Sequence, residues 1–185
     1  MSMAHLGFYV DMKRCVGCMT CQIACKDKFD LDVGEFGRRV ARYEGGAYPA
    51  PFVYSVSLSC GHCDDPACVK VCPAGAMTKD AATGLVLHDQ ARCIGCRSCE
   101  AACPYGAPTY VKATGKVTKC NGCKDKLDAG KPPLCVSGCR VRALEFGDID
   151  ALKAAHPGWV GRIREYADPA RTSPNVIFKP RREAL

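Results

Sequence analysis

The sequence lacks most features that mark a membrane-spanning, exported or catalytic chain. Its 185 residues include one tryptophan. No apolar run approaches the roughly 20 residues that a spanning helix needs, and residues 1–15 contain no apolar segment of signal-peptide length. We recognise no acid–base pair, nucleophilic triad or phosphate-binding loop. We therefore expect no membrane span, no leader of its own and no enzymatic site on this chain.

Cysteine is abundant instead, with 16 residues. This content is typical of a disulfide framework or of a metal–thiolate protein. The cysteines lie in tight runs rather than spread along the chain, and nothing in the sequence directs it to an oxidising compartment. The spacing therefore favours metal binding over disulfides.

The formal net charge of +7 does not indicate nucleic-acid binding. Sixteen thiolates around four cubic iron–sulfur cores of charge +2 would together carry about −8, which leaves the holoprotein near −1. There is no long stripe of aromatic and basic residues. We interpret the surplus of Lys and Arg as compensation for buried anionic clusters, and we expect no nucleic-acid partner.

The cysteines fall into four groups with none left over. Each group begins C-x2-C and ends C-x3-C, and the middle gap is two, four, two and eleven residues in chain order. In order, the groups are Cys15, Cys18, Cys21 and Cys25; Cys60, Cys63, Cys68 and Cys72; Cys93, Cys96, Cys99 and Cys103; and Cys120, Cys123, Cys135 and Cys139. This internal repeat predicts repeated metal-binding units.

The spacing favours iron–sulfur clusters over zinc. Structural zinc is usually held by two separated C-x2-4-C pairs. The run C-x2-C-x2-C-x3-C-P binds [4Fe-4S] clusters in bacterial ferredoxins, and its fourth cysteine ligates the neighbouring cluster. The third group, CIGCRSCEAACP, matches the whole run, and the first group lacks only the proline. Three closely spaced thiolates suit three corners of a cubane, so we expect ligand exchange between clusters.

The residue before the second cysteine is glycine in three groups, at Gly17, Gly95 and Gly122. Glycine permits backbone angles that bring N–H groups close to sulfur. The second group has His62 there. We interpret it as a solvated loop histidine in preference to a hydrogen-bond donor beside a cluster.

The residue after the last cysteine also differs between groups. Pro73 and Pro104 should end the helical turn that carries that cysteine. Lys26 and Arg140 stand in the same place in the first and fourth groups. A cation there would favour the reduced cluster, and an ordinary surface charge is equally consistent with the sequence.

Outside the cysteine groups, alternating β-branched residues predict a strand over residues 51–60. Residues 148–156 predict a short helix with Ile149 and Leu152 on one face. The remainder, residues 159–185, has little periodicity and is either a frayed tail or a docking arm. We favour the docking arm, because exposed apolar residues in a tail, here Val176, Ile177 and Phe178, usually have a partner.

Nearly the whole chain resembles the iron–sulfur electron-transfer subunit of the dimethyl-sulfoxide-reductase family of molybdenum enzymes. The resemblance rests on the order of the four groups and on the stretches GFYVDMKRCVGCMTCQIACKD, SCGHCDDPACVKVCPAGAM, ARCIGCRSCEAACPYGAP, TKCNGCKDKLDAGKPPLCV and PNVIFKP. It implies an α+β fold of two bacterial-ferredoxin-like modules, each with two [4Fe-4S] clusters, with hairpin insertions and an extended C-terminal tail. Arg140, where members often have proline, and the short C-terminal extension depart from the family pattern.

The resemblance also implies how the cysteines share clusters. Spacing alone supports exchange, whereas the pairing of the two outer groups comes from the family. The implied ligand sets are Cys15, Cys18, Cys21 and Cys139; Cys60, Cys63, Cys68 and Cys103; Cys93, Cys96, Cys99 and Cys72; and Cys120, Cys123, Cys135 and Cys25. The implied domains are an outer module (1–59 and 105–147), an inserted module (60–104), and a helix with a docking tail (148–185).

The implied function is to relay single electrons between a quinol-oxidising membrane anchor and a molybdopterin catalytic subunit. We expect a peripheral location on the cytoplasmic membrane, on its outer face if the protein is co-exported with a partner. The alternatives are an independent soluble polyferredoxin, the electron subunit of a formate dehydrogenase or of a thiosulfate or polysulfide reductase, and a zinc scaffold that binds nucleic acid.

Overall fold

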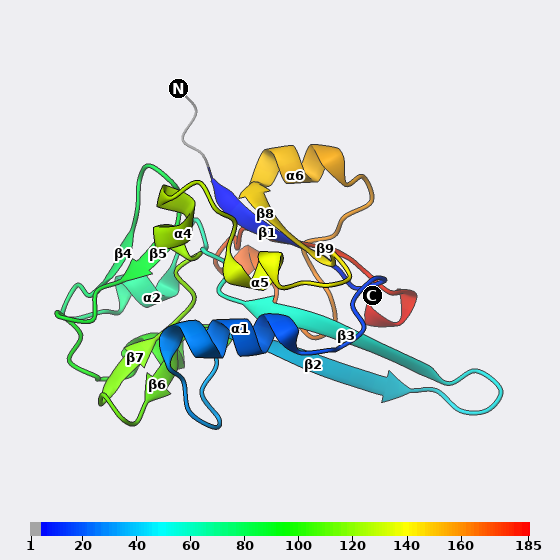
Figure 1. The fold of residues 1–185 in the computed structure, drawn as a ribbon, viewed down its shortest axis with the longest axis horizontal. Coiled ribbons are helices and arrows are strands. Elements are labelled where there is room, and N and C mark those ends of the chain that lie inside the picture. Colours follow the sequence, from blue (N-terminus) through cyan, green and yellow to red (C-terminus); the bar gives the residue numbers. More distant parts are fainter. Residues whose placement is uncertain (1–4) are drawn as a thin grey trace.

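The computed structural model describes residues 5–185, in which short helices and strands are mixed, confirming the α+β class (Figure 1). The strands are β1 (Leu6–Asp11), β2 (Arg38–Gly45), β3 (Phe52–Ser59), β4 (Met77–Lys79), β5 (Val86–His88), β6 (Thr109–Val111), β7 (Lys116–Thr118), β8 (Leu144–Asp148) and β9 (Val176–Lys179). The helices are α1 (Thr20–Phe29), α2 (Ala67–Lys70), α3 (Ser98–Ala102), α4 (Lys124–Asp128), α5 (Leu134–Ser137) and α6 (Ile149–Ala155), with 3-10 turns η1 (Pro169–Arg171) and η2 (Arg182–Ala184).

A three-stranded sheet of order β8-β1-β9 brings the two ends of the protein together. β1 pairs antiparallel with β8 and parallel with β9. Five of the six residues of β1 are buried. A central strand that is covered on both faces needs a nearly continuous apolar run, which LGFYV supplies. The sheet therefore holds the first and fourth cysteine groups side by side, because they follow β1 and precede β8.

The first and third cysteine groups enter helices of different length. α3 ends at Ala102, and its C-cap Cys103 is extended (φ −78°, ψ 114°) because Pro104 follows it. α1 continues four residues past Cys25, since Lys26 rather than proline follows it. Lys26 and Lys28 lie in its last turn, where a cation interacts favourably with the helix dipole.

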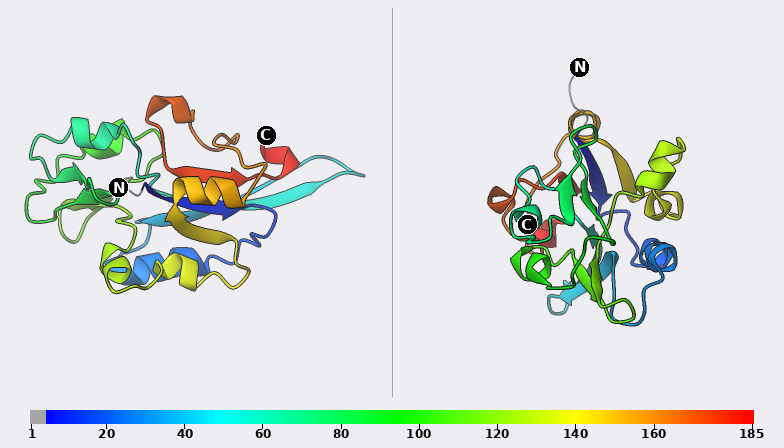
Figure 2. Two further views of the ribbon diagram at one scale, coloured as in Figure 1. Left: turned by 90° about the horizontal axis from the view of Figure 1, so that it is seen from above. Right: turned by 90° about the vertical axis from the view of Figure 1, so that its left-hand side faces the viewer.

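Helix α2 and the hairpins β4–β5 and β6–β7 lie together towards one end of the molecule (Figures 1 and 2). Glycines at positive φ, Gly84 (70°) and Gly115 (66°), lie in the turns of the two hairpins. The division into an outer and an inserted module stays a prediction. Residues 1–4, the start of the predicted outer module, lie outside the described residues.

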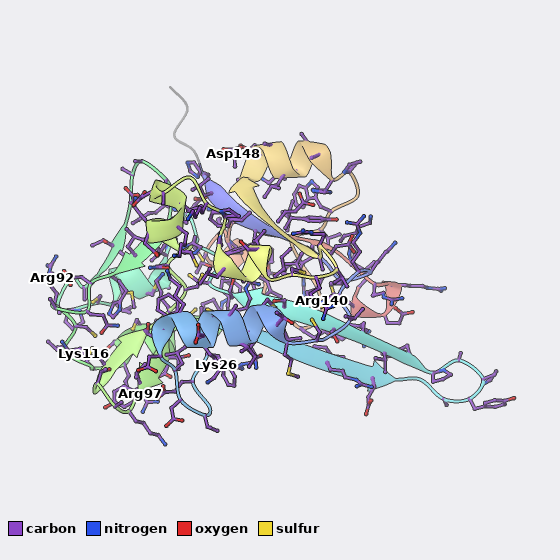
Figure 3. The ribbon with its side chains drawn as sticks, viewed as in Figure 1. Lys26, Arg92, Arg97, Lys116, Arg140 and Asp148 are labelled. Carbon is purple, nitrogen blue, oxygen red and sulfur yellow. The ribbon has the colours of Figure 1, made fainter. Side chains whose placement is uncertain are left out.

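The predicted strand at residues 51–60 is β3, which pairs with β2 in a long hairpin (Figure 2). The predicted helix at 148–156 is α6. Its N-cap is Asp148, labelled in Figure 3, whose carboxylate accepts hydrogen bonds from the N–H groups of Asp150 and Ala151. Ile149 and Leu152 are buried, as the helical spacing predicted. Within residues 5–185, no helix has the length and apolar content to cross a membrane.

The C-terminal segment is not an extended docking tail. That interpretation took its apolar residues to be exposed, and they are buried. Val176, Ile177 and Phe178 are 8%, 2% and 0% exposed. They form β9, whose partner β1 lies about 170 residues earlier in the sequence, so the apolar cluster completes the protein's own core. The sequence could not show this, because a strand that pairs with a remote segment has no local partner.

We expect Phe178→Ala to lower the free energy of unfolding by roughly 3–5 kcal/mol, because it leaves a cavity under the sheet. The apparent midpoint of thermal unfolding, followed anaerobically by circular dichroism, measures the effect. Val33→Ala is the control, since Val33 is 93% exposed. Equal midpoints for the two variants would contradict the buried position of β9.

Candidate metal centres

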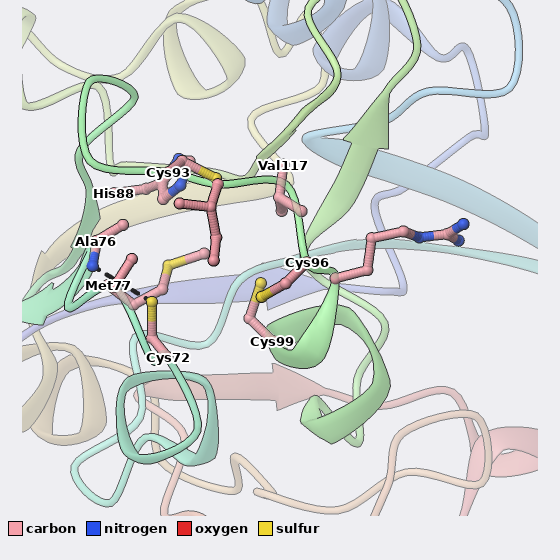
Figure 4. Close-up of a pocket in the computed structure, with 11 residues that line it drawn as sticks. Cys72, Ala76, Met77, His88, Cys93, Cys96, Cys99 and Val117 are labelled. Atoms are coloured by element: carbon pink, nitrogen blue, oxygen red, sulfur yellow. Dashed lines mark hydrogen bonds between the residues drawn. The ribbon is translucent and has the colours of Figure 1, made fainter.

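The structure gathers most of the cysteines around three cavities, each lined by three members of one group and the last member of another. We call them the first, second and third sites. The first has Cys15, Cys18, Cys21 and Cys139; the second has Cys60, Cys63, Cys68 and Cys103; the third, shown in Figure 4, has Cys93, Cys96, Cys99 and Cys72.

The four remaining cysteines, Cys120, Cys123, Cys135 and Cys25, are all buried, and we call them the fourth site. Burial is the main cause that raises the pKa of Cys120 and of Cys25, and charges of neighbouring thiols add to it: Cys25, Cys60 and Cys135 at Cys120, and Cys135, Cys123 and Cys21 at Cys25. Three of the four sets that the family resemblance implies each line one cavity, and the fourth set stays a prediction. Whether each set binds one cluster stays a prediction.

The donor sets fit a group larger than a single ion. None of the 16 cysteines forms a disulfide. In a tetrahedral zinc site with 2.3 Å bonds the sulfurs would lie roughly 3.8 Å apart. Within residues 5–185, no three His, Cys, Asp or Glu side chains converge around one ion. The thiols of the first, second and third sites line cavities instead, as a cubane with one cysteine at each iron requires.

Buried hydrogen-bond donors without partners also fit such a group. Nε and Nη2 of Arg38 and the hydroxyl of Tyr166 are buried and make no hydrogen bond. Arg38 lies beside thiols of the first and fourth sites, and Tyr166 beside thiols of the second. Sulfur atoms of a cluster would accept these hydrogen bonds and remove the cost of leaving the donors unpaired.

The loops adopt the backbone that the glycines predicted. φ is +72° at Gly17, +72° at Gly95 and +69° at Gly122. In the fourth group this conformation directs the N–H of Gly122 to the first cysteine, Cys120, at 3.4 Å. Such donors stabilise thiolates and help to set the potential of a cluster.

The interpretation of His62 as a solvated loop histidine is wrong. Its side chain is 0% exposed, and its backbone takes the same left-handed conformation as the three glycines (φ 46°). Nδ1 accepts a hydrogen bond from the N–H of Val86 at 3.1 Å, while Nε2 lies 3.8 Å from the sulfur of Cys120. Burial holds its pKa well below the usual range, so the ring is neutral and is protonated on Nε2. His62 therefore donates towards the fourth site from the loop of the second group.

Sequence reasoning missed a repeated donor at the fourth residue after the last cysteine. The N–H of Ala76 donates to Cys72 at 3.3 Å, and the N–H of Ala143 donates to Cys139 at 3.2 Å. Ala107 donates in the same way to Cys103. The signal is Cys-x3-Ala, present in every group except the first, where α1 continues. Each alanine is buried, which explains its small side chain.

Two side-chain hydroxyls from remote segments also contact cluster-site sulfurs. Thr172 donates to Cys63 at 3.2 Å, and Ser57 lies 3.3 Å from Cys21. No spacing rule could have found these residues. The position of Thr172 shows that the C-terminal segment covers the second site as well as completing the sheet.

Two buried cations lie between sites. Arg38 and Lys119 are each 2% exposed. Nζ of Lys119 lies 3.8 Å from the sulfur of Cys60 and donates to the carbonyl of Cys120 at 2.8 Å, so it links the second and fourth sites. The net charge suggested that surplus Lys and Arg residues compensate buried anions, and Arg38 and Lys119 are placed to do so.

The two cations that replace proline, Lys26 and Arg140, are not buried between sites as Arg38 and Lys119 are. The ammonium of Lys26 donates to the carbonyls of Asp32 and Glu35, so it closes the loop after α1. Arg140 is exposed, and its charge contributes to lowering the pKa of Cys18 after larger contributions from Thr20 (Figure 3).

Burial disfavours free thiolates at most sites. It raises the pKa of Cys25 and of Cys68 to about 12. Cys18 and Cys96 are the two exposed cysteines among the sixteen. Hydrogen bonds from Thr20 and Ser98 lower the pKa of these two thiols. The buried sulfurs therefore carry charge at neutral pH only when a metal stabilises it.

Comparison with known proteins agrees with this donor chemistry. Residues 51–149 match the family described as a 4Fe-4S dicluster domain, and residues 12–33 match a 4Fe-4S binding domain. The B subunit of the anaerobic dimethyl sulfoxide reductase of Escherichia coli is 46% identical over 94% of this protein and 88% of its own length. The corresponding B subunit of Haemophilus influenzae is 44% identical over 98% and 92%. The thiosulfate reductase electron transfer subunit PhsB of Salmonella typhi is 39% identical over 94% and 90%.

We expect Gly95→Ala to reduce both the iron content and the thermal stability. An added Cβ at Gly95 would lie 2.1 Å from the carbonyl oxygen of Gly115, so the loop and the β6–β7 turn must separate. Gly106→Ala is the matched control, because Gly106 also has positive φ but nothing lies within 4 Å of its Cβ. It should show only the backbone strain, about 1–2 kcal/mol. Equal iron content and stability in both variants would refute the close contact.

Proposed function

Because this protein belongs to the iron–sulfur electron-transfer subunits of the dimethyl sulfoxide reductase family, we propose that it relays single electrons through four [4Fe-4S] clusters. A bound cluster supplies one-electron chemistry at a potential set by its surroundings. The protein's residues provide the ligands, hydrogen bonds and charges that hold each cluster. The substrate reaction takes place on another subunit.

One observation carries the proposal: at each of the three cavities, three cysteines of one group meet the last cysteine of another. This arrangement is what ligand exchange between paired clusters requires. The four sites account for every cysteine of the sequence. We therefore propose that each of the four sites, as defined above, holds one [4Fe-4S] cluster.

Contacts between the sites support a linear order. The second and third sites exchange Cys72 and Cys103. Lys119 and His62 link the second site to the fourth through Cys120. Arg38 lies by thiols of both the fourth and the first sites. We propose the order first, fourth, second, third, with outer and inserted modules that correspond to the two exchanging pairs.

The two exposed cysteines belong to the sites at the ends of this order. Cys18 is at the first site, and Cys96 is at the third. Apolar side chains adjoin them, since Val16 is 67% exposed and Ile94 is 68% exposed. Electron transfer needs close approach without intervening solvent, so these two loops are the proposed entry and exit. Arg92, Arg97 and Lys116 lie around the third-site end (Figure 3).

The partners that we propose are a molybdopterin catalytic subunit at one end and a quinol-oxidising membrane anchor at the other. The basis is the family, in which relatives are named as the B subunit of anaerobic dimethyl sulfoxide reductase. We place the protein peripherally at the cytoplasmic membrane within that complex. An independent polyferredoxin would instead be purified without either partner.

Ligand exchange can be tested with paired Cys→Ala substitutions in the anaerobic holoprotein. Cys60→Ala and Cys103→Ala should each abolish or alter the electron paramagnetic resonance signal of the same cluster, and the double variant should do no more than either one, because the two residues share a site. Combining Cys103→Ala with Cys99→Ala should affect two clusters. The reverse pattern would show that Cys103 belongs to the third site.

Entry and exit can be tested in the purified complex with Val16→Glu and Ile94→Glu. A buried glutamate at a subunit contact is costly, so each should slow electron exchange with one partner by at least tenfold. Stopped-flow absorbance separates reduction by quinol from oxidation by the terminal acceptor. Val33→Glu, at a fully exposed loop position, should change neither rate. Unchanged rates in both end variants would contradict the proposed ends.

A further inference from the structure

Arg38 is a charged side chain that points into the protein from a strand. Its neighbours in β2 alternate, so Arg38 is buried, Arg39 is exposed and Val40 is buried. Gly37 precedes it, and a Cβ at Gly37 would lie 2.8 Å from the sulfur of Cys25. The backbone at residue 37 therefore passes close to a cysteine of the fourth site, with the guanidinium carried inwards from the next residue.

The guanidinium is only partly satisfied by the protein. Nη1 donates to the hydroxyl of Ser57 at 3.0 Å and to its carbonyl at 3.3 Å, whereas Nε and Nη2 have no partner. The ring of Phe8 lies 4.4 Å from Cζ. No carboxylate within residues 5–185 pairs with it. A buried guanidinium without a counter-charge is strongly unfavourable, so an anion must lie beside it in the holoprotein.

The groups that face Arg38 are thiols of two different sites. Its charge lowers the pKa of Cys21 at the first site and of Cys25 and Cys120 at the fourth, opposing the larger effect of burial. Ser57, which accepts from Nη1, also contacts Cys21. The anions that geometry supplies are therefore those held at the first and fourth sites.

We infer that Arg38 is the shared counter-cation of the first and fourth clusters, to whose sulfur atoms Nε–H and Nη2–H donate, and that it raises both reduction potentials. This inference rests on the proposed function. Reduction adds one negative charge to a cluster, and a fixed cation in a water-excluded position favours that state. One residue thereby sets the potentials on both sides of a single electron-transfer step.

The effect should be large because neither salt nor water screens the charge. Exposed cations such as Arg140 are surrounded by solvent, where screening reduces their influence. Arg38 is also permanently charged, so its contribution should not change between pH 6 and 9. A lysine at this position would keep the charge but would lose the planar set of donors.

The experiment compares Arg38→Gln, Arg38→Lys and the control Arg39→Gln in the anaerobic complex. Arg39 is the adjacent, exposed residue of the same strand. Potentiometric titration monitored by electron paramagnetic resonance should show that Arg38→Gln decreases the equilibrium constant for reduction of two clusters by at least tenfold, which is about 59 mV for one electron. Those two should be the clusters affected by Cys21→Ala and Cys120→Ala. Arg38→Lys should restore more than half of the shift, and Arg39→Gln should cause none.

A second measurement on the wild-type protein covers the case in which Arg38→Gln loses iron. With ¹⁵N-arginine incorporated, hyperfine spectroscopy of the reduced complex should detect ¹⁵N coupling that disappears in Arg38→Lys and persists in Arg140→Gln. Absence of that coupling, or unshifted potentials in an iron-replete Arg38→Gln variant, would overturn the inference. Iron far below sixteen atoms per wild-type molecule would instead overturn the proposed function, so the two failures are distinguishable.

Discussion

The protein must keep the negative charge of its cysteine thiolates inside a fold of 185 residues, and the rest of the structure depends on this constraint. Burial raises the pKa of most of the thiols, so every anionic group there needs iron, N–H donors or cations around it. The loops supply N–H groups through left-handed residues, and the Cys-x3-Ala turns supply more. Arg38 and Lys119 supply full positive charges. The main hydrophobic core contains residues of both the three-stranded sheet and the β2–β3 hairpin, together with cysteines of the first, second and fourth groups.

The same requirement explains why remote segments converge on the sites. β9 pairs with β1, and Thr172 from the preceding turn donates to Cys63. The C-terminal segment therefore stabilises the sheet that holds the first and fourth groups and also covers the second site. This coupling makes the folding of the termini and the integrity of the sites interdependent, even though the cysteines lie in short local runs.

Local features could be predicted from the sequence because they depend on neighbouring residues. Positive φ at Gly17, Gly95 and Gly122 followed from the cysteine spacing, and the end of α3 followed from Pro104. His62 could not be placed in this way. It was assigned to solvent because it replaces a glycine in a loop, yet its ring fills a space between the second and fourth groups, and that space exists only after folding.

The sequence by itself determined the chemistry: the number and spacing of the cysteines indicate cubane clusters, because three thiolates within one tight loop match three corners of such a core. Only the tertiary structure decided which groups face one another, which two sulfurs reach the surface and which cations are buried between the sites. Those outcomes depend on long-range strand pairing and on the inward or outward direction of each side chain. The adjacent pair Arg38 and Arg39 illustrates the reason, since two identical residues differ in burial solely through the alternation of one strand.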